Sequence, residues 1–87
     1  MPTVEIYTTL FCQFCSRAKS LLHKKGVKFS EIGVDSDPAL RQQMTDRSGG
    51  GKTVPQIFID GIPIGGSDEL AALEGSGELD RLLQTTE

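Results

Sequence analysis

The segment Thr53–Gly66, TVPQIFIDGIPIGG, determines how the sheet of this chain is built. Two runs rich in β-branched and aromatic residues flank the dipeptide Asp60-Gly61. Asp-Gly between two such runs is the strongest short hairpin signal in the sequence. A connection this tight makes the strands that it joins antiparallel. We therefore predict a β-hairpin within this segment.

Upstream of the hairpin, strand and helix patterns alternate. Residues 4–7 alternate weakly between apolar and polar side chains and predict a short strand. Apolar residues at helical spacing predict a helix over residues 15–25, and residues 27–34 indicate a second strand. Asp37 is followed by a proline, which is typical of an N-cap and the first position of a helix. We expect this second helix to run to about residue 47.

Downstream of the hairpin, two more helices are expected. Ser67 is a predicted N-cap, and the acids Asp68 and Glu69 suit the positive end of a helix dipole. Leucines after residue 77 indicate a last, short amphipathic helix. In the resulting order β-α-β-α-β-β-α-α, strands joined through a helix should lie parallel and the hairpin strands antiparallel. We predict one α/β domain over residues 1–87, with a four-stranded mixed sheet flanked by helices.

The composition is ordinary for a soluble globular protein. Of the 87 residues, 37% are hydrophobic and 24% are charged, and the net charge is −3, which argues against a disordered or fibrous class. Basic residues gather near the start and acidic residues near the end, so no basic stripe favours a nucleic-acid partner. The longest apolar run, Ile57–Ile59, is far shorter than the ~20 residues that span a bilayer. The start lacks a basic region followed by an apolar block, so we expect a cytoplasmic protein without a secretory signal or membrane contact.

The segment Thr9–Ser16, TLFCQFCS, holds both cysteines of the chain. It lies at the carboxyl end of the first predicted strand, and in open α/β sheets this edge is where ligands bind. A structural zinc site needs four ligands, whereas the two cysteines and His23 supply three, which argues against a structural zinc site within one chain. An inert buried pair is a second alternative, because free cysteine is commonly a core residue.

A reactive pair is the interpretation that the local chemistry favours. Free N–H groups and the helix dipole stabilise an anionic sulfur at Cys12, and nearby cations act in the same direction. Cys15 lies one turn further on, on the apolar face of the helix, and should be shielded. An exposed attacking sulfur beside a covered resolving sulfur suits thiol–disulfide exchange.

Four blocks of sequence together resemble the glutaredoxin family, in its small bacterial dithiol form with a thioredoxin-like fold. They are VEIYT in the first strand, C-x-F-C-x-R-A-K at Cys12–Lys19, TVPQIFIDG at Thr53–Gly61 and IGGSDEL at Ile64–Leu70. The resemblance covers essentially the whole chain. It implies a monomeric, glutathione-dependent oxidoreductase that reduces protein disulfides and protein–glutathione mixed disulfides, with Cys12 as nucleophile and Cys15 as resolving thiol.

The resemblance also implies a site for glutathione as co-substrate, with no tightly bound cofactor. In this family a cis proline, here Pro55, turns the backbone of Val54 toward the active sulfur, where it can pair with the tripeptide like an added strand. Backbone N–H groups at a helix start suit the γ-glutamyl carboxylate, and Asp68 suits its ammonium group. The implied glutathione-binding residues are Phe14, Arg41, Thr53, Val54, Pro55, Gly66, Ser67 and Asp68.

The chain departs from the family pattern near the site. Gln13 stands where dithiol members usually carry proline, and Thr8 stands where a lysine often helps to hold the glycine carboxylate of glutathione. Arg41 and Lys52 are candidate replacements for that charge. The sequence GGGK at residues 49–52 lengthens the loop before the proline, and its glycines are expected to make the loop mobile.

A cluster carrier is the alternative function. Some relatives hold a [2Fe–2S] cluster between two subunits, with bound glutathione as the extra ligands, and in this chain Cys12 would be the metal ligand if a cluster is bridged. Gln13 removes a proline that is thought to disfavour this assembly. Cys15 argues against it, because most such carriers have a single cysteine in the site.

Overall fold

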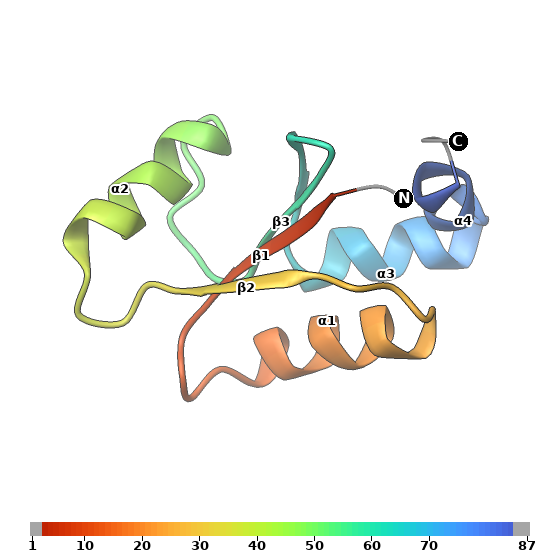
Figure 1. Cartoon of the computed structure of the whole chain (residues 1–87), viewed down its shortest axis with the longest axis horizontal. Helices are drawn as coiled ribbons and strands as arrows, with labels where there is room; N and C mark the ends of the chain where they lie inside the picture. The colour runs from red at the N-terminus through yellow and green to blue at the C-terminus, as the bar shows by residue number, and fades with distance from the viewer. Residues whose placement is uncertain (1–2, 85–87) are drawn as a thin grey trace.

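Strands and helices follow one another along residues 3–84, the part of the chain that this computed structural model describes (Figure 1). Their order is the predicted β-α-β-α-β-β-α-α. The elements are β1 (Val4–Thr8), α1 (Gln13–Lys24), β2 (Ser30–Gly33), α2 (Pro38–Arg47), β3 (Gln56–Ile59), β4 (Ile62–Gly65), α3 (Ser67–Ser76) and α4 (Glu78–Leu83).

The strands form a mixed sheet in the order β2-β1-β3-β4. β1 and β2 are connected through α1 and lie parallel, whereas β3 is antiparallel to both β1 and β4. At the turn between β3 and β4, Asp60 and Gly61 have φ angles of 53° and 79°. Two positive φ values are what a two-residue hairpin turn of this kind requires. The predicted hairpin and the predicted fold class are therefore confirmed.

Helices cover both faces of the sheet (Figure 1). Because side chains alternate along β1, Ile6 points into the core under α1, α3 and α4, and Tyr7 points into the core under α2. The larger core comprises Val4, Ile6, Ala18, Leu22, Ile57, Ile59, Leu70 and Leu79. The smaller core comprises Tyr7, Val34, Met44 and Phe58. Within residues 3–84, no helix has the length and apolar character needed to span a bilayer.

Polar contacts strengthen the attachment of α2 to the sheet. The Tyr7 hydroxyl donates to Gln43 Oε1 over 2.6 Å and accepts from Arg47 Nη1 over 2.8 Å. Arg47 Nη2 also lies 2.8 Å from the Glu5 carboxylate, and its guanidinium carbon lies 4.3 Å from the centre of the Phe58 ring. The hydrogen bond to Glu5, followed by that to Tyr7, raises the pKa of Arg47.

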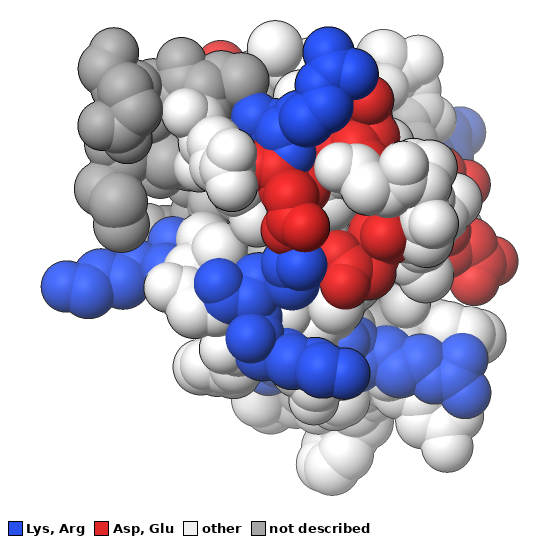
Figure 2. Space-filling model, turned by 90° about the vertical axis from the view of Figure 1, so that its right-hand side faces the viewer, with Lys and Arg blue, Asp and Glu red and all other residues white. Residues whose placement is uncertain are grey.

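The basic and acidic parts of the chain meet on one face of the fold. Figure 2 shows Lys and Arg side chains gathered beside Asp and Glu side chains on this face. Lys25, which follows α1, lies 2.9 Å from the carboxylate of Glu74 in α3 and 2.6 Å from that of Asp80 in α4. Hydrogen bonds to Asp80 and then to Glu74 raise the pKa of Lys25. Opposite charges thus join the end of α1 to the C-terminal helices.

Several element boundaries differ from those predicted. β2 is limited to Ser30–Gly33 because these residues pair with β1. α1 begins two residues earlier than expected, since Cys12 is its N-cap. α3 begins at Ser67, so that Gly66 and not Ser67 is the N-cap, and the Gly66 N–H donates to Glu69 Oε1 over 2.7 Å.

Candidate active site

Cys12 takes the place of a capping side chain at the start of α1. Its backbone is extended, with φ −133° and ψ 108°, and its Sγ accepts the Cys15 N–H over 3.1 Å. An N-cap is usually an oxygen-bearing side chain that satisfies one of the free N–H groups of the first turn. Here the half-buried Cys12 does so, with its sulfur at the N-terminal end of α1.

Cys15 is buried in the first turn of α1, with 1% of its surface exposed. Burial, followed by its hydrogen bond with Cys12, raises the pKa of the Cys15 thiol to about 11. The two sulfurs therefore differ as expected from their sequence positions, with Cys12 accessible and Cys15 covered and protonated at neutral pH. This difference fixes which sulfur reacts first with an outside disulfide.

The loop before β3 lies against the Cys12 sulfur. The Val54–Pro55 peptide bond is cis, as the resemblance implied, and Pro55 is buried. The Val54 carbonyl oxygen lies 3.9 Å from Cys12 Sγ. The backbone of Val54 therefore lies beside the Cys12 sulfur.

A small polar network holds this loop in place. The Gly51 N–H donates to Ser48 Oγ over 2.9 Å, and Gln56 Nε2 donates to the Thr53 carbonyl over 3.0 Å. A Cβ atom added to Gly51 would lie 2.6 Å from Ser48 Oγ and 2.7 Å from Gln56 Nε2. Gly51 therefore has a packing role that its place in a glycine run did not indicate. The buried Gln56 was also not predicted from the sequence.

A groove of about 400 Å³ opens between this loop, the start of α1 and the start of α3. Its volume is within the ≈ 300–1,000 Å³ typical of small-molecule sites. It is lined by Phe14, Thr53, Val54, Pro55, Gly66, Ser67, Asp68 and Glu69. Of these residues, Glu69 was not among the predicted ligand contacts, although as an acid at the third position of a helix it matches a capping box.

Two glycines allow close packing between the start of α3 and the cis-proline loop, which are the two sides of the groove. Gly65 has a φ of 114°, and a Cβ atom there would lie 2.9 Å from the Glu69 side chain. A Cβ atom on Gly66 would lie 3.3 Å from the Pro55 carbonyl oxygen and 3.3 Å from Glu69 Oε1. The Gly-Gly pair thus lets the start of α3 approach the loop that carries the cis proline.

The cysteine pair and the cis-proline loop lie in the part of the chain that matches a known protein family. The family described as glutaredoxin matches residues 4–64 of the chain, which include both cysteines, the cis-proline loop and β3. The chain belongs to the glutaredoxin family. It is a dithiol, glutathione-dependent disulfide oxidoreductase whose Cys-x-x-Cys pair is Cys12 and Cys15.

Relatives of this glutaredoxin match over nearly its whole length. Glutaredoxin 3 of Escherichia coli strain K12 is 54% identical over 84 residues, which is 97% of this chain and 100% of the relative. A solved glutaredoxin from Brucella melitensis has a TM-score of 0.84 and 49% identity, covering 98% of this chain and 91% of that one. A buckwheat glutaredoxin–glutathione complex has a TM-score of 0.85 and 28% identity, covering 94% and 76%.

Thr8, a departure from the family pattern, and Arg41, a candidate replacement for the missing charge, both lie away from the groove. Thr8 is buried and its hydroxyl donates to the Glu31 carboxylate over 2.8 Å, so it faces β2. Arg41 Nη2 donates to the Lys52 carbonyl over 3.2 Å, and both residues line a separate hollow of about 510 Å³ beside α2. Of the predicted glutathione-binding residues, Arg41 is the one that the structure does not bring into the groove.

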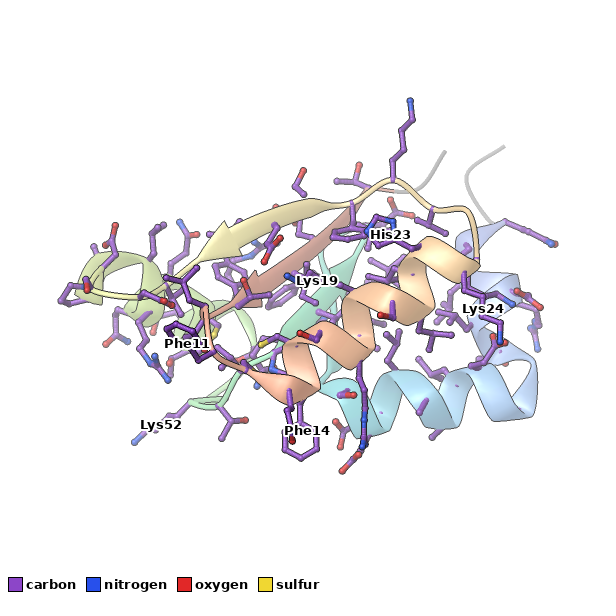
Figure 3. The ribbon with its side chains drawn as sticks, turned by 90° about the horizontal axis from the view of Figure 1, so that it is seen from below. Phe11, Phe14, Lys19, His23, Lys24 and Lys52 are labelled. Carbon is purple, nitrogen blue, oxygen red and sulfur yellow. The ribbon has the colours of Figure 1, made fainter. Side chains whose placement is uncertain are left out.

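Cations on α1 near the cysteines are engaged by other groups. Lys19 Nζ lies 2.9 Å from the Glu31 carboxylate, and its hydrogen bond, followed by that from Thr8, lowers the pKa of Glu31. The Arg17 guanidinium carbon lies 5.7 Å from the centre of the Phe14 ring. His23 lies toward the other end of α1 from Phe14, far along the helix from the reactive pair (Figure 3).

Proposed function

We propose that Cys12 is the nucleophile of this oxidoreductase and that protein–glutathione mixed disulfides are substrates. The Cys12 thiolate attacks the glutathione sulfur, so that a Cys12–glutathione disulfide forms and the bond between protein and glutathione breaks. The protein leaves as a thiolate and takes a proton from solvent. The thiolate of a second glutathione then attacks the glutathione sulfur held on Cys12. This releases glutathione disulfide and restores the Cys12 thiolate.

Protein disulfides follow a second route that uses Cys15. Attack by Cys12 links the enzyme to one substrate cysteine and releases the other. The Cys15 thiol then loses its proton and attacks Cys12 Sγ, which forms the Cys12–Cys15 disulfide and releases the second substrate thiolate. Once Cys12 is in a disulfide, its hydrogen bond and charge no longer oppose ionisation of Cys15. The pKa of Cys15 should therefore fall at the step that needs it as a nucleophile.

The groove beside Cys12 is our proposed glutathione site. Backbone groups of Val54 can pair with the tripeptide, and N–H groups of Ser67 and Asp68 at the start of α3 suit its γ-glutamyl carboxylate. The Gly66 N–H is already bonded to Glu69, so the next two N–H groups are the better donors. Phe14 is half-exposed and forms an apolar wall. The buckwheat glutaredoxin–glutathione complex, which has the same fold, supports this assignment. We place the reaction in the cytoplasm, where thiols are kept reduced.

The observation that carries this mechanism is the sulfur of the half-buried Cys12, which accepts a helix N–H beside the cis-proline groove. Cys12→Ser should abolish reduction of a glutathione mixed disulfide in an assay coupled to glutathione reductase. Cys15→Ser should retain this activity, because its sulfur is used only for protein disulfides, and should lose most reduction of a protein disulfide. Turnover by Cys12→Ser would refute the assignment of the nucleophile.

A glutathione-ligated [2Fe–2S] cluster shared by two copies is the second candidate function. Among residues 3–84, no group of three or more Cys, His, Asp or Glu side chains is placed to hold a metal, so one chain alone does not fit such a cluster. Cys12 from each copy, which is not fully buried, would fit it when completed by glutathione. Anaerobic reconstitution with iron, sulfide and glutathione tests this candidate. A coloured dimer on gel filtration supports it, and a colourless monomer rejects it.

A further inference from the structure

The turn from β1 into α1 leads directly to the nucleophile and receives little support from its own side chains. It consists of residues 9–11, between the end of β1 at Thr8 and the N-cap Cys12. Leu10 is 82% exposed and Phe11 is 99% exposed, so neither side chain packs into a core. The path of this turn therefore depends on hydrogen bonds to its backbone.

The Leu10 N–H makes one such bond, and its acceptor is a carboxylate from the connection between β2 and α2. It donates to Asp35, over 2.9 Å to one oxygen and 3.3 Å to the other. Beside it, the Val34 N–H donates to the Thr8 carbonyl over 2.9 Å, which extends the parallel pairing of β1 with β2. The next bond of a regular parallel ladder would join the Leu10 N–H to the Val34 carbonyl. The Val34 carbonyl instead accepts the Asp37 N–H over 3.3 Å, and the Asp35 side chain takes its place as acceptor.

The backbone on both sides of Asp35 is anchored, so the position of its carboxylate is well defined. Val34, before it, is buried. Ser36, after it, has a φ of 58°, in the left-handed region that residues other than glycine rarely adopt. Asp37 is the N-cap of α2, and its carboxylate accepts the Leu40 N–H over 3.1 Å. A strained residue persists where the surrounding structure determines its conformation, and this one lies between the carboxylate that braces the turn and the one that caps α2.

The cation that shares a hollow with Asp35 is engaged by another carboxylate. Lys19, Glu31 and Asp35 line this hollow, which has a volume of about 520 Å³ and extends to Leu10. Lys19 Nζ lies 2.9 Å from the Glu31 carboxylate. The Asp35 carboxylate is therefore directed to the backbone of the turn. Its partner is a neutral N–H group, which an amide oxygen can bond equally well.

The braced turn bears on both cysteines. The backbone of Cys12 is extended, with φ −133° and ψ 108°, and its Sγ lies 3.1 Å from the Cys15 nitrogen. Burial has the largest effect on the pKa of Cys15 and raises it, whereas a backbone hydrogen bond from Thr9, in the turn, lowers it. Movement of the turn would therefore change both the placement of the attacking sulfur and the surroundings of the resolving one.

We propose that Asp35 is a positioning residue for the nucleophile. Its carboxylate holds the turn through the Leu10 N–H and so keeps Cys12 Sγ at the start of α1. The inference rests on the proposed mechanism and adds to it a residue outside the glutathione groove. Asp35 neither makes nor breaks a bond to sulfur. Because a reaction slows steeply when a reacting atom is displaced, the brace affects the attack step more than binding.

Two substitutions of Asp35 test this role. With the mixed disulfide of glutathione and 2-mercaptoethanol as substrate, Asp35→Ala should lower kcat/KM about fivefold, equivalent to ~1 kcal/mol. The loss should appear in kcat, with both KM values within about twofold of the wild type, because Asp35 does not line the groove. Asp35→Asn should recover kcat to within about twofold of the wild type, since its amide oxygen accepts the same N–H.

Asp37→Ala is the matched control. It removes a carboxylate of the same connection that also accepts a backbone N–H, but its partner is Leu40 in α2. It should destabilise the fold in urea and keep the wild-type kcat. Hydrogen exchange followed by NMR reports the brace itself. The Leu10 amide should exchange about fivefold faster in Asp35→Ala than in the wild type, Asp35→Asn or Asp37→Ala.

The possible outcomes separate the brace from the mechanism. A wild-type kcat in Asp35→Ala, or equal exchange of the Leu10 amide in Asp35→Ala and the wild type, overturns the inference and leaves the mechanism intact. Equal losses of kcat in Asp35→Ala and Asp35→Asn assign the effect to the charge, and an equal loss in Asp37→Ala assigns it to general destabilisation. Either result also overturns the inference. A wild type that reduces no mixed disulfide refutes the proposed mechanism instead.

Discussion

Replacing Gly51 by alanine tests whether the network at Ser48, Thr53 and Gln56 positions the cis-proline loop. The new Cβ atom would lie 2.6 Å from Ser48 Oγ and 2.7 Å from Gln56 Nε2, distances at which one partner must move. Both atoms make the hydrogen bonds that hold the loop, at 2.9 Å and 3.0 Å. Losing two such bonds at about 0.5–1.5 kcal/mol each destabilises the fold by about 1–3 kcal/mol.

Urea unfolding of Gly51→Ala measures this loss directly. A decrease of about 2 kcal/mol in the free energy of unfolding corresponds to a fall in Tm of roughly 8–16 °C for a domain of this size. The loop also lines the glutathione groove, so the KM for glutathione should rise. Gly33→Ala is the matched control, because a Cβ atom there meets nothing within 4 Å. If Gly51→Ala unfolds within 0.5 kcal/mol of Gly33→Ala, about the size of an ordinary surface substitution, the network does not hold the loop.

Three further predictions follow from individual groups. With its pKa at about 11, Cys15 is about one part in a thousand thiolate at pH 8, so mass spectrometry should find iodoacetamide on Cys12 long before Cys15. The pKa of Glu31 is lowered by Lys19, so its carboxylate stabilises the fold above pH 4.5 and this contribution is lost as the pH falls below that value. Unfolding free energies of wild type and Glu31→Gln should therefore converge in acid, and a constant difference from pH 7 to pH 3 would contradict this. Asp37→Ala removes the side-chain bond that caps α2 and should cost about 1 kcal/mol in urea unfolding, whereas no loss would show that the cap is dispensable.

Local signals in the sequence were sufficient for the fold and for the reactive pair. The Asp60-Gly61 dipeptide predicted a turn that needs two positive φ angles, and the structure has both. Asp37 caps α2 as expected, with its carboxylate accepting a first-turn N–H over 3.1 Å. The different burial of Cys12 and Cys15 followed from their places in one helical turn. Each of these features depends on neighbours within a few residues, which the sequence displays directly.

Features that depend on distant residues were not predictable in the same way. The length of β2 is set by the partner residues that β1 offers, and no pattern within residues 27–34 shows this limit. The role of Gly51 depends on the side chain of Gln56, across the cis-proline loop. Arg41 occupies the expected helix but donates to the Lys52 carbonyl, because the orientation of a long side chain is decided by tertiary contacts.

The unequal size of the two cores has a consequence for motion. α2 rests on the smaller cluster around Met44 and Phe58, supported by a chain of polar bonds through Tyr7, whereas α1 and α3 share the larger cluster. Cooperative units with less buried apolar surface open more often, so amide hydrogens of α2 should exchange with deuterium before those of α1. Residues 48–55 connect α2 to β3 and include the cis-proline loop that lines the groove. Such an opening would therefore move this loop away from α1, while the two cysteines would keep their positions on α1.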